Sequence, residues 1–261
     1  MKRHYATLGH RLPAFLARLL FGDRCRFGLE IRKDDPDWQE WQKFYLTFYE
    51  NTQKRGIGKK VNDAGYEILR RVDLTAKDVL EVGPGSLPHR RFWNGKPSHY
   101  TVVDISQEFI DRSMQVLKQE AVTASSFVST ADDLPLKNES VDVLLSFYSL
   151  EHMHPLESYL AQFRRVLRPG GLLVGAIPCE GGLAWGGGRL ITSRRYIKNN
   201  SGINPDKIIC WEHPNYADRV LRTLADFFES VWILFWPLRV PWIDFNLICS
   251  FVYKNRSPSI E

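Results

Sequence analysis

The most constraining feature of this sequence is an apolar run that ends in a glycine-containing turn and precedes a second apolar run. The first run and its turn are residues Asp78–Ser86 (DVLEVGPGS), and the second run is Thr101–Ile105 (TVVDI). A buried strand, a tight turn and a second strand that ends in a carboxylate make up the nucleotide-binding half of a doubly wound α/β domain. The sequence therefore predicts a parallel sheet with a ligand site at one edge.

The turn departs from the dinucleotide-binding pattern G-x-G-x-x-G. Gly83 and Gly85 let the backbone approach a ligand where any Cβ would collide, but position 88 is Pro88 rather than glycine. Glu81 also places an acid two residues before the first glycine. Asp104, about 20 residues further on, can accept two hydrogen bonds from a ribose diol. The site is therefore expected to bind a nucleotide while differing from an ordinary dinucleotide site.

Strand and helix patterns alternate along most of the chain. Strands are expected at about 79–82, 100–104, 126–129, 141–147, 172–177, 231–236 and 245–253, and helices near 61–71, 107–120, 156–167 and 215–228. Alternation of this kind is typical of a parallel sheet with helices on both faces. The last two strands are too close in sequence for a crossover and should pair as a hairpin. The predicted fold is a three-layer α/β/α domain whose doubly wound, Rossmann-like sheet has seven strands, mostly parallel, with the last antiparallel.

Composition narrows the class of protein. A formal net charge of +5 falls short of the concentrated basic surface of a nucleic-acid binder, so no nucleic-acid partner is expected. The four cysteines lack the spacing of a zinc or redox pair, so reduced thiols and no metal site are expected. No apolar run reaches the roughly 18 residues of a membrane-spanning helix. These features predict a cytoplasmic protein.

The first 22 residues are basic and contain no acid. The basic side chains among them that bear on membrane contact are Lys2, Arg3, Arg11 and Arg18. Apolar residues recur there at helical spacing, which fits a helix covering the domain, a helix on the inner membrane surface, or a targeting segment. Residues 1–22 are thus a candidate peripheral membrane contact.

An aromatic stripe follows this basic segment. Its members, at helical intervals, are Trp38, Trp41, Tyr45, Phe48 and Tyr49. Such a stripe more often packs on a core than on a ligand, and part of it could also line the site. We therefore expect residues 1–60 to form a helical cap or lid on a domain of residues 61–261.

Two further segments complete a family pattern. Residues 131–136 read ADDLPL and residues 165–171 read RVLRPGG. With the Glu-x-Gly-x-Gly turn, the acid at the end of the second strand and the terminal hairpin, they resemble the class I S-adenosylmethionine-dependent methyltransferases. The sequence is most similar to the broad methyltransferase type 11 group, whose members act on quinones, sugars, lipids and other small molecules. This resemblance implies methyl transfer with S-adenosyl-L-methionine as cofactor.

The resemblance also implies roles for nine cofactor-binding residues. Glu81, Gly83 and Gly85 would surround the methionine portion and the sulfonium of the cofactor. Asp104 would hold the ribose hydroxyls, Ile105 would pack on the adenine face, and Ala131 and Asp132 would contact the adenine edge. Ser146 and Phe147 would line the pocket below the methyl group. Two positions depart from the family pattern. Leu87 replaces a third glycine and Thr130 replaces an acid, which puts the shape of the turn and the adenine amino contact in doubt.

Two histidines are candidates for the base that a hydroxyl acceptor needs. His152 follows the fourth strand, at the edge where ligands bind in open α/β folds, and Glu151 could orient it. A structural role in helix entry or pocket closure is the alternative for His152. His213 lies in an insertion at about 178–215, where this family varies to recognise its acceptor.

Glycines and basic residues mark this insertion. Gly181-Gly182 and residues 186–188 predict flexible turns suited to a lid. The basic residues are Arg189, Arg194, Arg195 and Lys198. They would suit an acceptor with phosphate or carboxylate, although a solvated loop face would look the same in sequence.

The sequence thus predicts a methyltransferase acting, at oxygen if a histidine is the base, on a small molecule, glycan or lipid-linked intermediate. Methylation of nucleic acid or protein is an alternative, disfavoured because the Asn/Asp-Pro-Pro-aromatic and catalytic-cysteine motifs are lacking. A non-catalytic S-adenosylmethionine-binding protein is a second alternative. An NAD-linked oxidoreductase is disfavoured by Pro88 and the terminal hairpin.

Overall fold

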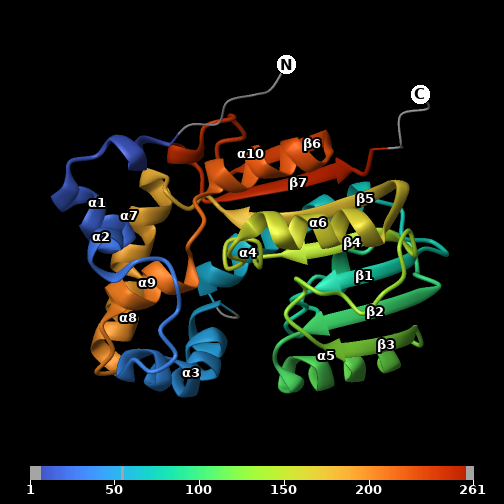
Figure 1. The fold of residues 1–261 in the computed structure, drawn as a ribbon, viewed down its shortest axis with the longest axis horizontal. Coiled ribbons are helices and arrows are strands. Elements are labelled where there is room, and N and C mark those ends of the chain that lie inside the picture. The colour runs from blue at the N-terminus through green and yellow to red at the C-terminus, as the bar shows by residue number, and fades with distance from the viewer. Residues whose placement is uncertain (1–6, 54–55, 257–261) are drawn as a thin grey trace.

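Seven strands form one sheet, in the order β3-β2-β1-β4-β5-β7-β6 (Figure 1). The computed structural model describes residues 7–53 and 56–256. The strands are β1 Asp78–Val82, β2 His99–Asp104, β3 Thr123–Val128, β4 Val141–Phe147, β5 Leu167–Pro178, β6 Glu229–Trp236 and β7 Ile248–Lys254. Neighbours among β1 to β5 pair in parallel, whereas β7 runs antiparallel between β5 and β6. The predicted Rossmann-like sheet with an antiparallel last strand is confirmed.

Helices connect and cover the strands. Their bounds are η1 Leu8–Arg11, α1 Ala14–Phe21, α2 Arg24–Phe27, α3 Pro36–Phe48, η2 Tyr49–Gln53, α4 Gly56–Tyr66, η3 Glu67–Arg71, η4 Arg90–Phe92, α5 Gln107–Gln119, α6 Leu156–Val166, α7 Leu183–Ile191, α8 Ser193–Asn200, α9 Pro205–Glu212, α10 Ala217–Phe227 and η5 Ile243–Phe245. Asp35 and Asn204 cap α3 and α9 by accepting from main-chain amides, and a proline follows each cap. No helix in the described residues is long and apolar enough to cross a membrane.

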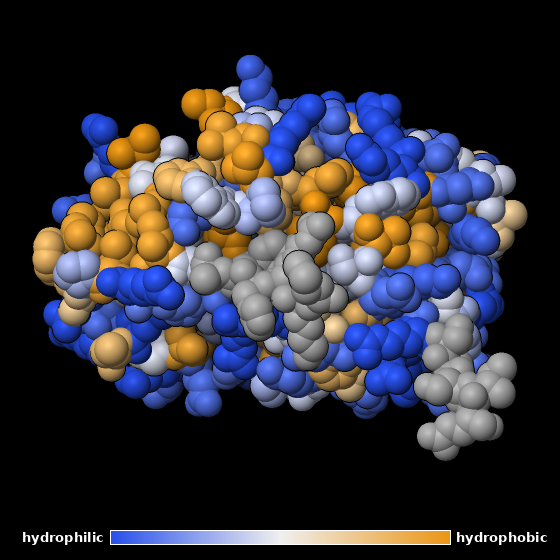
Figure 2. All heavy atoms as spheres, turned by 90° about the horizontal axis from the view of Figure 1, so that it is seen from above, coloured by the Kyte–Doolittle hydropathy of each residue, from blue (hydrophilic) through white to orange (hydrophobic). Residues whose placement is uncertain are grey.

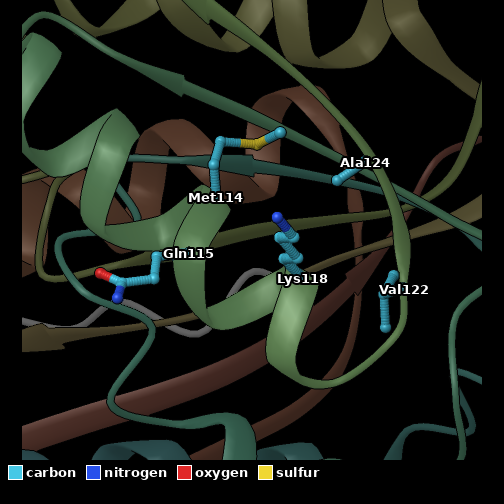
Figure 3. Close-up of a pocket in the computed structure, with 5 residues that line it drawn as sticks. All are labelled: Met114, Gln115, Lys118, Val122 and Ala124. Carbon is cyan, nitrogen blue, oxygen red and sulfur yellow. The ribbon is translucent and has the colours of Figure 1, made fainter.

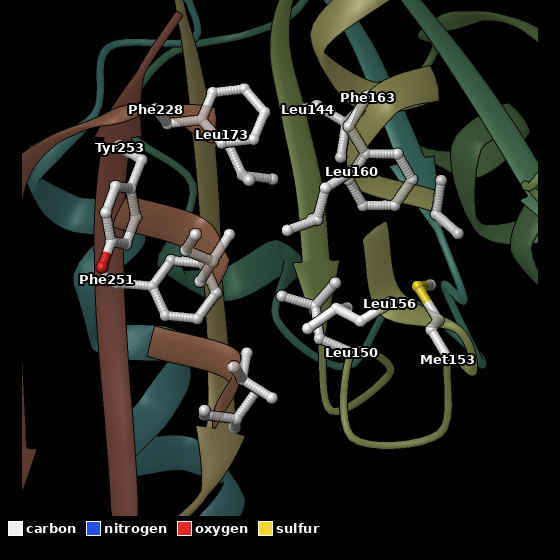
Figure 4. Packing of buried hydrophobic residues seen from close by; sticks show 14 of the residues in the cluster. Leu144, Leu150, Met153, Leu156, Leu160, Phe163, Leu173, Phe228, Phe251 and Tyr253 are labelled. Carbon is white, nitrogen blue, oxygen red and sulfur yellow. The ribbon is translucent and has the colours of Figure 1, made fainter. Parts of the chain in front are cut away.

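The sheet is buried between two apolar layers. On one face α6 and α10 cover the strands: Leu160 and Phe163 lie against Leu144 of β4, and Phe228 lies beside Leu173 of β5 (Figure 4). On the other face α4, η3 and α5 pack on the same strands. Burial on both faces explains why the central strands are continuous apolar runs that a sequence pattern can find.

Several strand boundaries differ from expectation. β5 begins at Leu167 rather than near residue 172, because Leu167 already pairs with Val141 of β4 on the far side of a register shift. The starts of β3 and β7 also differ for physical reasons. β3 begins at Thr123, earlier than predicted, because main-chain pairing with β2 extends over polar residues that carry no apolar signal. β7 begins at Ile248, later than predicted, because the side chain of Asn246 organises the preceding turn. Its amide donates to the carbonyls of Val240 and Trp242, while its oxygen accepts from the amide of Leu238.

A third apolar cluster joins two segments that are far apart in sequence. It unites α3 with α8 and α9 of the insertion through Trp38, Trp41, Phe48, Ile197, Ile203, Ile208, Cys210 and Trp211. The indole of Trp211 donates to the carbonyl of Phe27 at 3.2 Å. These helices lie together at the left of Figure 1, beyond the ends of the strands.

The expected flexible turn at residues 186–188 is wrong, because these glycines lie inside α7. A Cβ on Gly186 would come within 2.7 Å of the Phe21 ring of α1. The glycine therefore serves close packing of two helices, and the insertion is largely helical.

Trp211→Ala should destabilise the protein by about 3–5 kcal/mol, since it removes a fully buried indole from the third cluster. Trp242→Ala is the matched control: this indole is 64% exposed, and its loss should cost within about 0.5 kcal/mol. Urea denaturation measures both. Equal midpoints for the two variants would contradict the packing described.

Candidate active site

The carboxyl ends of β1, β2 and β4 meet at one edge of the sheet and bring the predicted site residues together. The amide of Gly83 donates to the carbonyl of Val103 at 2.9 Å, which places the glycine turn beside Asp104. The hydroxyl of Ser149, which follows β4, donates to the carbonyl of Val82 at 3.3 Å. This is the edge where doubly wound sheets bind ligands.

Both glycines of the turn are required by its shape. Gly83 and Gly85 have φ angles of +74° and +57°, and a Cβ on Gly83 would lie 3.0 Å from the Cβ of Ser149. A Cβ on Gly85 would lie 3.1 Å from the hydroxyl of Tyr49. Leu87, where relatives were expected to have a third glycine, adopts a positive φ of 51° and is fully buried. The turn therefore has left-handed backbone angles at position 87 although the residue there is not glycine.

Glu81 anchors the turn from beneath. Its carboxylate is buried and accepts from Tyr100 and from Nε2 of His89, each at 2.6 Å. The indole of Trp93, which can only donate, is 3.1 Å from Nδ1 of His89. Nδ1 is therefore the acceptor and Nε2 carries the proton. Oε1 of Glu81 thus fixes the segment that follows the turn, and Oε2 joins β1 to Tyr100 of β2. The contact of Glu81 with the methionine portion of a cofactor stays a prediction.

Asp104 and Ile105 have the exposure that a nucleoside site needs. Burial raises the pKa of Asp104 to about 6, opposed by the amides of Ser106 and Ile105 and assisted by the charge of Glu81. The side chain of Ile105 is 74% exposed at the same edge. A half-buried acid beside an exposed aliphatic side chain fits a ribose diol and the flat face of a base.

The loop after β3 also reaches this edge, because the amide of Ser129 donates to the carbonyl of Asp104 at 3.0 Å. Ala131 is buried with a φ of +53°, and Asp132 is exposed with its carboxylate accepting from Thr130. Their contact with an adenine edge stays a prediction.

Ser146 and Phe147 are both buried at the end of β4. The hydroxyl of Ser146 is 2.6 Å from that of Ser149. The ring of Phe147 packs at 5.2 Å from the rings of Tyr66 and His89. Phe147 therefore supports the turn from the core side, and its expected place in the pocket lining stays a prediction.

Aromatic residues of the N-terminal helices cover this edge. Tyr45 and Tyr49 stack on each other, and both rings meet Phe109 of α5 edge-on. Arg112 of α5 forms an ion pair with Glu50 at 3.1 Å, which joins the two segments. Burial raises the pKa of Tyr45, with nearby carboxylates, first among them that of Glu212, adding to the effect.

The two candidate histidines lie together although one follows β4 and the other ends the insertion helices. The ring centroids of His152 and His213 are 4.7 Å apart, and the ring planes meet at 68°. Arg24 of α2 fixes the second of them by donating to the carbonyls of His213 and Pro214 at 2.7 and 2.9 Å. Three distant segments thus build one polar cluster.

Glu212 orients His152, which corrects the expectation that Glu151 does so. Nδ1 of His152 lies 3.2 Å from the Glu212 carboxylate and also bonds its carbonyl, whereas Nε2 is 4.0 Å from Glu151. Trp41 holds the other oxygen of Glu212 at 2.7 Å. Burial lowers the pKa of His152, but the hydrogen bond of Glu212 and the charges of both glutamates outweigh it and raise the pKa to about 9.

The surroundings of His213 shift its pKa in the opposite direction to that of His152. Its Nδ1 lies 3.0 Å from Glu180, whose carboxylate also pairs with Arg189. Burial lowers the pKa of His213 to about 4, and the charge of Arg189 assists while Glu180 opposes. Near neutral pH, His152 is therefore cationic and His213 neutral.

Part of the predicted basic cluster forms ion pairs within the protein. Arg189 is buried in its ion pair with Glu180, and Arg194 pairs with Asp206. The expectation that both would present free charge to an anionic acceptor is therefore wrong. Arg195 and Lys198 are exposed on α8.

Glu151 has properties that the sequence did not reveal. Its side chain is buried, and its Oε2 has no hydrogen-bond partner among the described residues. Burial raises its pKa to about 7, opposed by His152. A carboxyl group that titrates near neutral pH is suited to proton transfer.

Two hollows lie outside this cluster. One, of about 480 Å³, lies between α5 and the first residues of β3, at the edge opposite the site (Figure 3). It is lined by Met114, Gln115, Lys118, Val122 and Ala124. The second, of about 470 Å³, is lined by residues 27–32 and His154, two positions beyond His152.

The fold is the one found in solved S-adenosylmethionine-dependent methyltransferases. Residues 80–175 match the family model described as a methyltransferase domain, in the type 11 group. This part of the chain is therefore a methyltransferase domain, a class of domain that uses S-adenosyl-L-methionine as its methyl donor.

Similar proteins support the same class. A malonyl-[acyl-carrier protein] O-methyltransferase of Hamiltonella defensa is 24% identical over 43% of this chain and 42% of its own length. A probable phthiotriol/phenolphthiotriol dimycocerosates methyltransferase of Mycobacterium ulcerans is 29% identical over 61% and 63%. The chain thus spans less than two thirds of either relative. The N-methyltransferase NodS of Bradyrhizobium japonicum, solved with S-adenosyl-L-homocysteine, shares the fold with a TM-score of 0.59 at 14% identity, over 85% of this chain and all of NodS.

Asp104→Ala should weaken binding of S-adenosylmethionine by about 1–3 kcal/mol, as for loss of hydrogen bonds to a charged group. In the unaltered protein, affinity should also fall as the pH drops below about 6, because ribose hydroxyls donate to the ionised carboxylate and protons compete for it. Calorimetry between pH 7.5 and 5 measures both effects. The isosteric Asp104→Asn variant should bind weakly with a flatter pH dependence; an unchanged slope would remove Asp104 from the ribose site.

Proposed function

We propose that this protein transfers a methyl group from S-adenosylmethionine to an oxygen of a small molecule, glycan or lipid-linked intermediate. The observation that carries the proposal is the partly buried acid–histidine cluster after β4, in a segment whose Ser149 reaches the glycine turn. An oxygen acceptor gains from a base, and this cluster contains groups that titrate on both sides of neutral pH. The names of two relatives, a malonyl-[acyl-carrier protein] O-methyltransferase and a probable phthiotriol/phenolphthiotriol dimycocerosates methyltransferase, are consistent with such acceptors.

The chain's residues fit the proposed cofactor. Gly83 and Gly85 present bare backbone, Asp104 supplies a carboxylate for the ribose, Ile105 supplies an apolar face, and the remaining predicted contacts are Glu81, Ala131, Asp132, Ser146 and Phe147. When bound, the cofactor supplies an activated methyl group for in-line displacement. The protein then has to align the acceptor, exclude water and remove one proton from the acceptor.

Three groups are candidates to accept that proton or to assist its removal. His213 is neutral near pH 7 and could accept it, although its pKa of about 4 makes it a weak base. His152 is held cationic by Glu212 and is better suited to donate a hydrogen bond to the acceptor until the pH approaches 9. Glu151, with a pKa of about 7 and an unpartnered oxygen, matches the operating pH best. We propose Glu151 as proton acceptor, with His152 and His213 as its catalytic partners.

The acceptor would bind under the helical cap. The cap and the insertion both hold the cluster: Arg24 and Trp41 of the cap bond to the carbonyl of His213 and to the carboxylate of Glu212. We propose that residues 1–60 act as the lid of a domain of residues 61–261 and that residues 178–215 recognise the acceptor; of the lid, residues 1–6 and 54–55 lie outside the described part.

The first test is turnover. Purified protein should release S-adenosyl-L-homocysteine when supplied with the right acceptor, and the product should gain one methyl group by mass spectrometry. Malonyl-[acyl-carrier protein], a phthiotriol-type lipid alcohol and lipid extract are the first acceptors to try. Tight binding of the cofactor by calorimetry with no turnover on these acceptors or cell extract would favour a non-catalytic binding protein.

The pH dependence of kcat/KM should identify the base. Activity should rise with pH through about 7, because a base acts only when deprotonated. Glu151→Gln should remove this rise and slow turnover roughly 100- to 10,000-fold, with cofactor affinity retained. His152→Gln and His213→Gln should slow turnover while keeping the rise near pH 7. If the rise disappears in a histidine variant and persists in Glu151→Gln, that histidine is the base.

A further inference from the structure

One outer face of the protein carries an apolar patch built from both ends of the chain. The patch consists of exposed side chains of η1 and α1 and of the connection between β6 and β7: Leu8, Phe15, Leu19, Leu238, Trp242 and Phe245. Phe15 and Trp242 are 69% and 64% exposed. Clustered large apolar side chains on a protein surface mark an interaction site more often than isolated ones.

The two segments are held side by side. The amide of Leu8 donates to both carboxylate oxygens of Asp244 at 3.0 and 3.1 Å, which joins η1 to η5. α7 packs against both α1 and η5, through Gly186 and Gly182 respectively. Figure 2 shows apolar residues gathered in the left half of that face, where Figure 1 places α1 and, in red, the β6–β7 connection.

The charges around the patch favour one kind of partner. Arg11 and Arg239 are exposed on the two segments, and Arg18 is exposed beside Asp23. Asp244, which is 7% exposed, is turned inward to hold the Leu8 amide. Within residues 7–22 and 237–247 it is the only acid. The surface is therefore apolar, aromatic and positively charged.

We infer that this patch docks the protein on an anionic lipid surface. Tryptophan and phenylalanine favour the boundary between acyl chains and headgroups, and arginines at its rim attract anionic headgroups. The contact is made by two segments far apart in sequence, so neither the basic N-terminal segment nor the hairpin connection forms it alone. α7 links the patch to the site, since it touches α1 and η5 and also carries Arg189 of the histidine cluster.

Vesicle co-sedimentation of the full chain tests the inference. The protein should sediment with vesicles of phosphatidylcholine and phosphatidylglycerol, bind phosphatidylcholine alone less well, and lose part of the difference at about 0.5 M salt, where charges are screened. Phe15→Ser/Trp242→Ser should lower the partition coefficient about tenfold or more. Arg11→Gln/Arg239→Gln should lower it about tenfold on anionic vesicles only.

Ile57→Ser is the matched control, because Ile57 is 75% exposed on α4, outside the patch, and should leave partition unchanged. Circular dichroism and cofactor calorimetry should show that each variant is folded. Absence of vesicle binding by the unaltered protein, or equal binding by the Phe15/Trp242 variant, overturns the inference. So does light scattering that shows a dimer lost in that variant without any vesicle binding, since the patch would then pair two copies of the chain.

Discussion

The parallel alignment of β1 between β2 and β4 is the constraint on which the rest of the structure depends. Main-chain pairing brings the carboxyl ends of these strands level, so that Gly83, Asp104 and Ser149 meet at one edge. A shift of one residue in β1 would turn its side chains to the opposite faces of the sheet. Glu81 would then leave its buried contacts with Tyr100 and His89, and the turn would lose its support.

The helical cap lies at this edge and holds the residues of the polar cluster in place. Its third cluster holds Trp41 and Glu212 together, and Glu212 in turn fixes the ring of His152. Arg24 fixes the main chain at His213 in the same way. Packing of apolar helices thus determines the protonation of two histidines, because their pKa values follow from which carboxylates and cations the packing places beside them.

Much of the fold and part of the site could be predicted from local patterns. The strands of the core are apolar on both faces, and the turn needs Gly83 and Gly85 for its backbone angles, so both leave signatures in adjacent residues. The partner of His152 could not be predicted, because Glu151 is its neighbour in sequence while Glu212 arrives from α9. The glycines at 186–188 predict turns but lie in a helix, because glycine serves both turns and close helix contacts.

By itself, the sequence determined the seven strands, the helices between the strands of the core and the glycine turn followed by an acid at the end of β2, since these depend on residues close together in the chain. Only the tertiary structure decided which charges surround His152 and His213, that Arg189 is taken up by Glu180, and that the N-terminal helix shares a surface with the β6–β7 connection. The physical reason is that burial and pairing of side chains depend on distances in space. The sequence sets these distances only through the packing of the whole chain.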